Sequence, residues 1–106
     1  MYRIGLLEDD ESLGRELQYF LESNGYEARW ITLGEYAGKK PDEVIAMLVE
    51  EKLHLLLLDI GLPGLDGLHI CKQFRQQSEV PVIMITSKND ELTELIQWDV
   101  TEVLAE

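Results

Sequence analysis

Residues 55–67 read Leu-Leu-Leu-Leu-Asp-Ile-Gly-Leu-Pro-Gly-Leu-Asp-Gly, and this stretch decides the fold. Four consecutive leucines are too few for a buried helix and leave no polar face, so they predict a central parallel strand that is covered on both sides. Asp59 ends that strand, at the edge of an open α/β sheet where ligands bind. The proline and glycines that follow predict a loop, in which Asp66 caps a helix that starts near Gly67. Asp59 is therefore either a functional acid or only the residue that ends the strand and caps a turn.

The length and composition predict one globular domain. A chain of 106 residues with 45% hydrophobic residues can bury a single core. The formal charge of −12 argues against direct binding of nucleic acid or an anionic membrane, so any DNA contact would need another domain. The single cysteine, Cys71, cannot form an internal disulfide, and no apolar run is long enough to span a membrane. We therefore expect a cytoplasmic protein with no membrane contact.

Strand-like and helix-like segments alternate along the chain. Short apolar runs bounded by turn residues predict the strands, and apolar residues three or four positions apart predict the helices. Between the second strand and the second helix, residues 34–40 predict a polar loop. This alternation implies a parallel sheet with helices on both faces. The expected strands are 2–7, 26–32, 55–58 and 82–85, and the expected helices are 12–24, 41–52, 67–77 and one that starts at 89 or 90.

Three of the expected strands end in acidic or hydroxyl side chains. Glu8 and Asp9 follow the first strand, Asp59 ends the third, and Thr86 follows the fourth. A strand order of 2-1-3-4 would bring these ends into one crevice. Two unit charges about 4 Å apart repel by about 4 kcal/mol at an effective dielectric constant of about 20, so the carboxylates need a compensating charge. Oxygen ligands without clustered His or Cys favour Mg²⁺, and together with a carboxylate nucleophile they indicate phosphoryl transfer.

These motifs resemble the receiver domain of two-component response regulators. The resemblance rests on Glu8-Asp9, on Asp59 followed by Leu-Pro-x-x-Asp-Gly, and on Thr86-Ser87 after an apolar strand. It covers residues 1 to about 96. The acidic pair and the loop after Asp59 are most similar to the branch whose members carry a winged-helix DNA-binding domain. The resemblance implies an α/β fold of the flavodoxin-like class, with a doubly wound parallel sheet of order 2-1-3-4.

The resemblance also implies a role for each site residue. Asp59 would accept a phosphoryl group from a sensor histidine kinase and thereby switch a transcriptional output. Asp9 and Asp59 would bind Mg²⁺ directly, Glu8 would act through water, and the backbone carbonyl of Gly61 would complete the protein ligands. Thr86 would hold a phosphoryl oxygen and report its presence. Enzymatic activity would be limited to the domain's own phosphorylation and dephosphorylation.

Two features depart from the family pattern. The segment before Pro41 is several residues longer than is usual, which we interpret as a tolerated surface insertion. The family also has a lysine at the end of a fifth strand and then a fifth helix, whereas residues 97–106 contain neither a lysine nor a strand–helix pattern. We therefore expect residues 1–106 to form a single receiver domain that is incomplete at its C-terminus. The fifth strand and helix would be missing or replaced, with no catalytic lysine and no output domain.

The missing lysine leaves two other functions open. The domain could be an interaction module that keeps the acidic site without productive phosphorylation. A phosphatase with an aspartate nucleophile ranks lower, because Gly61 stands where such enzymes place a second aspartate.

The last residues predict a longer helix and a homodimer. One apolar stripe continues at helical spacing through Leu92, Leu95, Ile96, Val100 and Val103. This pattern favours an extended helix over the alternative, in which residues 100–104 pair as a strand. Without a fifth strand, residues 82–85 would form an unpaired sheet edge. We therefore expect self-association through the fourth strand and the last helix.

Overall fold

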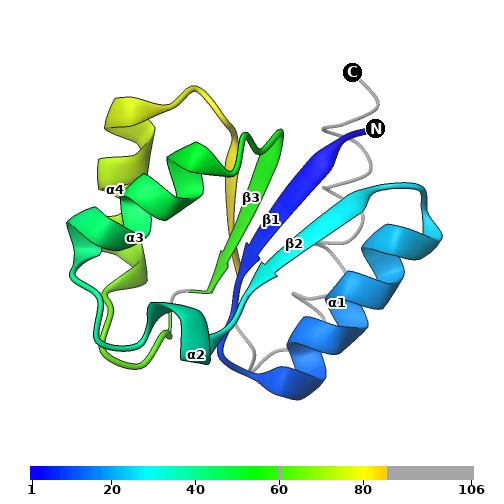
Figure 1. Cartoon of the computed structure of the whole chain (residues 1–106), viewed down its shortest axis with the longest axis horizontal. Coiled ribbons are helices and arrows are strands. Elements are labelled where there is room, and N and C mark those ends of the chain that lie inside the picture. Colours follow the sequence, from blue (N-terminus) through cyan, green and yellow to red (C-terminus); the bar gives the residue numbers. More distant parts are fainter. Residues whose placement is uncertain (60, 86–106) are drawn as a thin grey trace.

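The computed structural model describes residues 1–59 and 61–85, which form one parallel sheet with helices on both faces (Figure 1). The strands are β1 (Arg3–Leu7), β2 (Glu27–Ile31), β3 (Leu55–Asp59) and β4 (Val82–Ile85). The helices are α1 (Glu11–Ser23), α2 (Leu33–Tyr36), α3 (Pro41–Glu50) and α4 (Gly67–Gln77). All neighbouring strands are parallel, in the order β2-β1-β3-β4, which confirms the predicted flavodoxin-like fold class. The expected helix from residue 89 or 90 and the replacement of the fifth strand and helix lie outside the described residues.

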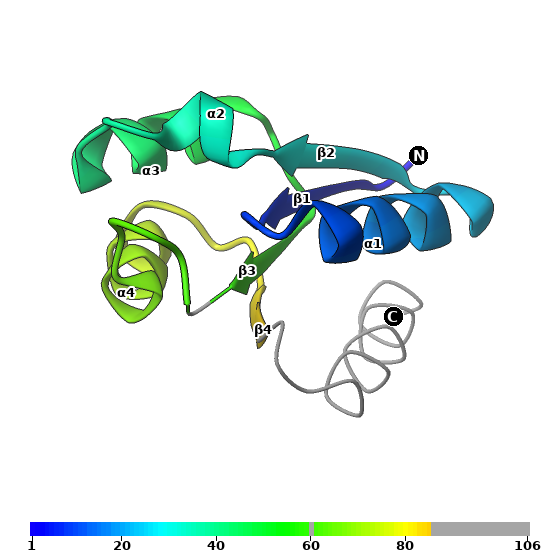
Figure 2. The same ribbon diagram turned by 90° about the horizontal axis from the view of Figure 1, so that it is seen from below.

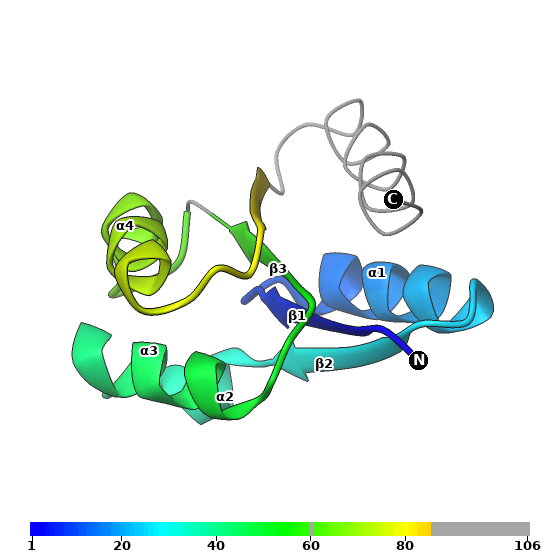
Figure 3. The ribbon, with the colours of Figure 1, turned by 90° about the horizontal axis from the view of Figure 1, so that it is seen from above.

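The helices divide between the two faces of the sheet. Helix α1 lies on one face, and α3 and α4 lie on the other (Figures 2 and 3). Each face has its own hydrophobic cluster, one under α1 and one under α3 and α4. Within residues 1–59 and 61–85, no helix has the length and apolar character needed to cross a membrane.

Strand β3 contributes leucines to both clusters. Leu55 and Leu57 belong to the cluster under α1, while Leu56 and Leu58 belong to the cluster on the opposite face. All four are at most 1% exposed. Because burial of a leucine side chain contributes about 1.5–3 kcal/mol, this strand is a main source of stability. The prediction of a central strand covered on both sides is confirmed.

Two aspartates cap helices at the edge of the sheet where the strands end. The Asp10 side chain accepts a hydrogen bond from the backbone N–H of Leu13 at 3.1 Å, at the start of α1. Asp66 accepts from the N–H groups of Leu68 and His69 at 3.0 and 3.4 Å, at the start of α4. The predicted capping role of Asp66 is thus confirmed, and both caps fix where the loops turn into helices.

The interpretation of residues 34–40 as a polar surface loop was wrong for their first part. Helix α2 begins one residue earlier, and its last residue, Tyr36, is only 1% exposed. The N–H of Thr32 donates to Oε2 of Glu35 at 3.3 Å, which closes this single turn. A helix of one turn has no measurable hydrophobic period, and the glycines around it resemble a loop. The longer segment is therefore partly built into the core.

Helix α1 and strand β2 meet at a glycine. A Cβ atom on Gly14 would overlap the indole ring of Trp30, so only a residue without a side chain lets the helix lie this close to the strand. Gly14 is itself buried within α1.

We expect Gly14→Ala to lower the free energy of unfolding by about 1–3 kcal/mol, because overpacking against Trp30 outweighs the better helix propensity of alanine. Urea unfolding followed by circular dichroism measures this change. Gly34→Ala in α2 is the matched control, because its Cβ would meet only Thr32 Oγ1, at 3.8 Å. A Gly14→Ala protein as stable as the wild type would contradict the proposed close contact.

Candidate functional site

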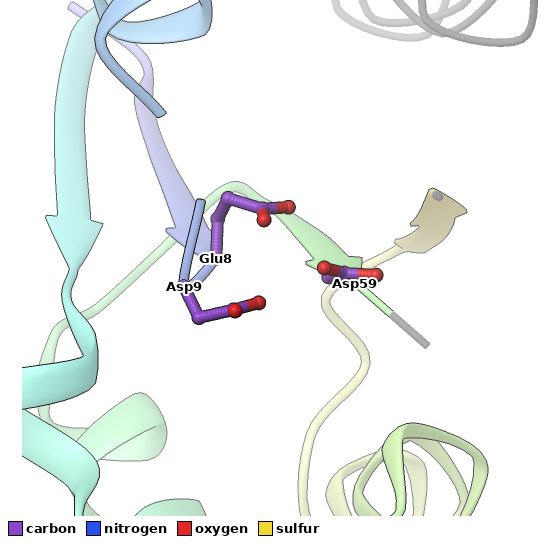
Figure 4. A group of neighbouring side chains, drawn as sticks. All are labelled: Glu8, Asp9 and Asp59. Carbon is purple, nitrogen blue, oxygen red and sulfur yellow. The ribbon is translucent and has the colours of Figure 1, made fainter. Parts of the chain in front are cut away.

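Three carboxylates meet at the edge of the sheet where β1 and β3 end. Glu8 and Asp9 follow β1, and Asp59 is the last residue of β3 (Figure 4). One oxygen from each of the three side chains lies within 4.8 Å of the other two. Glu8 is 0% exposed and Asp59 is 2% exposed, whereas Asp9 is partly exposed. The carboxylates are thus brought together as the sequence predicts, and they are largely shielded from water.

The strand register explains why these acids are neighbours. Leu7 pairs with Leu58 in the parallel ladder between β1 and β3. Glu8 and Asp59 each come one residue later, so they leave the sheet side by side. Because Leu6 and Leu7 of β1 and all of β3 are buried, neither acid can move far without exposing leucine side chains.

Three hydrogen bonds hold the loops that carry the acids. The backbone N–H of Asp10 donates to Oε1 of Glu8 at 2.9 Å, and that of Gly61 donates to Oδ1 of Asp59, also at 2.9 Å. Nε1–H of Trp30 donates to the backbone carbonyl of Glu8 at 3.0 Å. The second carboxylate oxygen of Glu8, Oε2, is buried and has no partner among the described residues.

The environment disfavours ionisation of two of these acids. Burial raises the pKa of Glu8 to about 8, against the hydrogen bond from Asp10, and neighbouring Asp59 adds to the rise. The pKa of Asp9 is also raised, first by burial and then by Asp59. No ion pair within residues 1–59 and 61–85 includes Glu8, Asp9 or Asp59. A positive charge from outside these residues would therefore favour ionisation of all three acids at neutral pH.

A divalent cation fits this donor set. All the converging ligands are carboxylate oxygens, and Oε2 of Glu8 has no hydrogen-bond partner among the described residues. Hard cations such as Mg²⁺ prefer oxygen donors and keep several waters. A cation here would remove the repulsion among the three carboxylates, and a carboxylate such as that of Asp59 is a group that can act as a nucleophile.

Two other predicted site residues are less completely described. Gly61 is exposed and lies in the turn after Asp59, with its N–H directed to that carboxylate. Thr86 lies outside the described residues, so its predicted contact with a phosphoryl oxygen stays a prediction.

Sequence reasoning missed two aromatic residues near the acids. No motif in the sequence marks Trp30 as a neighbour of the acids, and Tyr36 lies in the segment 34–40 that the sequence predicts to be a loop. Trp30 lies in the wall of a cavity of about 430 Å³ that borders Asp9 and is lined by Asp9, Glu11, Trp30, Thr32, Leu33 and Gly34. No spacing in the sequence predicts that Trp30 or Tyr36 lies near the acids, because the positions of both residues depend on how α1 and α2 pack. The one available signal was an aromatic residue near the end of a strand that neighbours the acidic strand ends.

Comparison with known proteins agrees with this geometry. The profile of the response regulator receiver domain matches residues 4–105. The alkaline phosphatase synthesis transcriptional regulatory protein PhoP of Bacillus subtilis is 39% identical over 95 residues. That alignment covers 89% of this chain but 37% of PhoP, so the chain spans less than two fifths of this relative's length.

Solved structures are similar in fold. The BeF₃-activated receiver domain of Klebsiella pneumoniae RstA is 31% identical, with a TM-score of 0.65, and the match covers 92% of this chain and 77% of that one. The Thermotoga maritima response regulator TrrA, solved in complex with the histidine kinase ThkA, has a structural match with a TM-score of 0.68 and 23% identity. That match covers 84% of this chain and 72% of the other, and it supports the fold alone. With the family profile matching nearly all of its residues and three acids gathered at the strand ends, the chain belongs to the family of response regulator receiver domains.

Proposed function

We propose that Asp59 accepts a phosphoryl group from a histidine kinase and that this modification switches the output of a longer response regulator. The observation that carries the proposal is the buried contact of Asp59 with Glu8 and Asp9 at the end of β3. A carboxylate that is shielded from water and surrounded by hard-cation ligands is arranged for nucleophilic attack on a phosphoryl group. The protein would act in the cytoplasm, and DNA binding would belong to a separate domain.

The proposed reaction transfers one phosphoryl group between two side chains. A carboxylate oxygen of Asp59 attacks the phosphorus of the kinase's phosphohistidine, an O–P bond forms and the P–N bond breaks. The electron pair of the P–N bond stays on the ring nitrogen, and the proton on the other ring nitrogen makes the leaving group a neutral imidazole. Mg²⁺, when bound, neutralises charge on the carboxylates and on the phosphoryl oxygens. Asp9 and Asp59 would hold it directly, Glu8 through water, and Gly61 through its backbone carbonyl. Thr86 would bind a phosphoryl oxygen after transfer.

The first prediction concerns the acceptor. Incubation with acetyl phosphate and Mg²⁺ should add one phosphoryl group, and peptide mapping by mass spectrometry should find it on Asp59. Asp59→Asn should abolish the modification. Asp66→Asn is a suitable control, because asparagine also caps helices well and position 66 lies in the same loop. Labelling that persists in Asp59→Asn would refute the assignment. A protein that binds Mg²⁺ but takes up no phosphoryl group would instead be an interaction module.

The second prediction concerns the metal. Millimolar Mg²⁺ should raise the melting temperature, because it relieves repulsion among Glu8, Asp9 and Asp59 only in the folded state. Differential scanning calorimetry measures this gain, and Asp9→Asn should remove most of it. Asp10→Asn keeps a good helix cap one residue away and should respond like the wild type. An equal gain in Asp9→Asn and wild type would place the metal elsewhere.

The third prediction concerns pH in the metal-free protein. An unfolded glutamate has a pKa near 4.5, whereas burial raises the pKa of Glu8 to about 8. Between these values the folded state binds more protons than the unfolded state, so the free energy of unfolding falls as the pH rises. Urea unfolding in a chelator should therefore give lower stability at about pH 8 than at about pH 6.

Glu8→Gln provides the control for this pH dependence. Glutamine cannot ionise, so most of the loss of stability between the two pH values should disappear. Added Mg²⁺ should stabilise the wild type more at the higher pH, because a cation binds the ionised carboxylates. Stability that rises with pH in the metal-free wild type would contradict the raised pKa of Glu8.

The fourth prediction concerns self-association. Among the described residues, β4 pairs only with β3. We propose that a second copy of the chain associates at this side of the sheet through β4 and the helix expected from residue 89 or 90, by edge pairing or by exchange of segments. Sedimentation velocity at tens of micromolar should detect a dimer. A single monomeric species over that concentration range would refute the proposal.

A further inference from the structure

The hydroxyl group of Tyr36 is buried and has no hydrogen-bond partner among the described residues. The side chain is 1% exposed and belongs to the cluster that also contains Leu7 and Leu58. Those two leucines immediately precede Glu8 and Asp59. A buried hydroxyl without a partner reduces stability and therefore needs an explanation.

Helix α2 carries Tyr36 to the edge of the sheet that holds the acidic residues. It lies beside the ends of the strand arrows in Figure 1. The three residues before Glu35, which are Thr32, Leu33 and Gly34, line the same cavity as Asp9. The segment that leads to Tyr36 thus forms one wall of the cavity that borders Asp9.

Ion pairs hold α2 in this position. Nη1 of Arg29 lies 3.1 Å from Oε2 of Glu35, and Nε of the same arginine lies 2.8 Å from Oε2 of Glu51. The guanidinium therefore joins β2 to α2 and to the residue that follows α3. Because Glu35 directly precedes Tyr36, this network limits how far the tyrosine can turn away.

The charges near Tyr36 favour its role as a donor. Burial raises the pKa of Tyr36 to about 12, and the charges of Asp9, Glu8 and Asp59 add to the rise. The phenol therefore keeps its proton at physiological pH and is available as a hydrogen-bond donor.

We propose that Tyr36 is a positioning residue of the acidic site, whose hydroxyl donates a hydrogen bond to an oxygen of the cation-loaded site. The acceptor is either a carboxylate oxygen or a water held by the cation. Cation binding keeps the carboxylates ionised, and an ionised oxygen is a stronger acceptor than a neutral one. The unpaired Tyr36 hydroxyl destabilises the metal-free protein, and its hydrogen bond would then stabilise the protein with the cation bound. This inference rests on the proposed binding of Mg²⁺.

Isothermal titration calorimetry with Mg²⁺ tests the inference by comparing the Mg²⁺ affinity of the wild type, Tyr36→Phe and Tyr26→Phe. Tyr36→Phe removes only the hydroxyl and should weaken Mg²⁺ binding about three- to tenfold, which is the effect of one lost hydrogen bond. Tyr26 packs against the cluster on the opposite face, so Tyr26→Phe should bind like the wild type. In a chelator, Tyr36→Phe should melt at the same temperature as the wild type or higher, because it lacks the unpaired hydroxyl.

Weaker Mg²⁺ binding without any loss of stability in the metal-free protein separates a positioning role of Tyr36 from a packing role. Equal Mg²⁺ affinity in Tyr36→Phe and wild type overturns the inference while the proposed metal site stands. An equal loss in Tyr26→Phe also overturns it, since the effect would then not depend on the site. A wild-type protein that binds no Mg²⁺ overturns both the proposed function and this inference.

A second measurement covers the case in which Tyr36→Phe does not fold. Wild-type protein labelled with ¹³Cζ-tyrosine gives one NMR signal for each of its four tyrosines. Phenylalanine substitutions at Tyr2, Tyr19 and Tyr26 assign the fourth signal to Tyr36. Addition of Mg²⁺ should shift the Tyr36 signal, because the Cζ shift responds to hydrogen bonding of the hydroxyl, and leave the other three in place. An unchanged Tyr36 signal overturns the inference.

Discussion

The parallel pairing of β1 and β3 is the constraint on which the rest of the structure depends. Both strands are buried on both faces, so their register cannot slip without moving leucines out of the core. That register ends the two strands together and places Glu8 beside Asp59. The acidic site therefore needs no long-range polar network to assemble, because hydrophobic burial assembles it.

This arrangement sets stability against function. The same burial that holds the strands removes water from the carboxylates and raises the pKa of Glu8. Hydrogen bonds from the N–H groups of Asp10 and Gly61 offset part of the lost hydration. No basic side chain among the described residues offsets the rest of the lost hydration or the repulsion between the carboxylates. A cation that binds only the folded state would relieve that repulsion and would bind more tightly for this reason.

The sequence was sufficient for the strand order and the acidic site, and insufficient for α2. Strand β3 is predictable because four leucines followed by an acid have one simple interpretation, and the helix caps follow from residue type and position. Helix α2 has one turn, so no periodic pattern identifies it, and burial of Tyr36 depends on contacts between distant parts of the chain. The same holds for Trp30, whose hydrogen bond to the carbonyl of Glu8 crosses from β2 to the loop after β1. The sequence pattern thus predicts the strands and longer helices better than it predicts how side chains pack between them.

The contact between Gly14 and Trp30 has a consequence for how this sequence can vary. A larger residue at position 14 requires a smaller one at position 30, yet a smaller residue would lose the indole N–H that holds the Glu8 carbonyl. Substitutions at positions 14 and 30 are therefore coupled, although only Trp30 contacts the loop after β1 that carries the acids. In relatives that keep this arrangement, glycine and tryptophan should be inherited as a pair, and substitution of either should appear only together with a new way of anchoring the loop after β1.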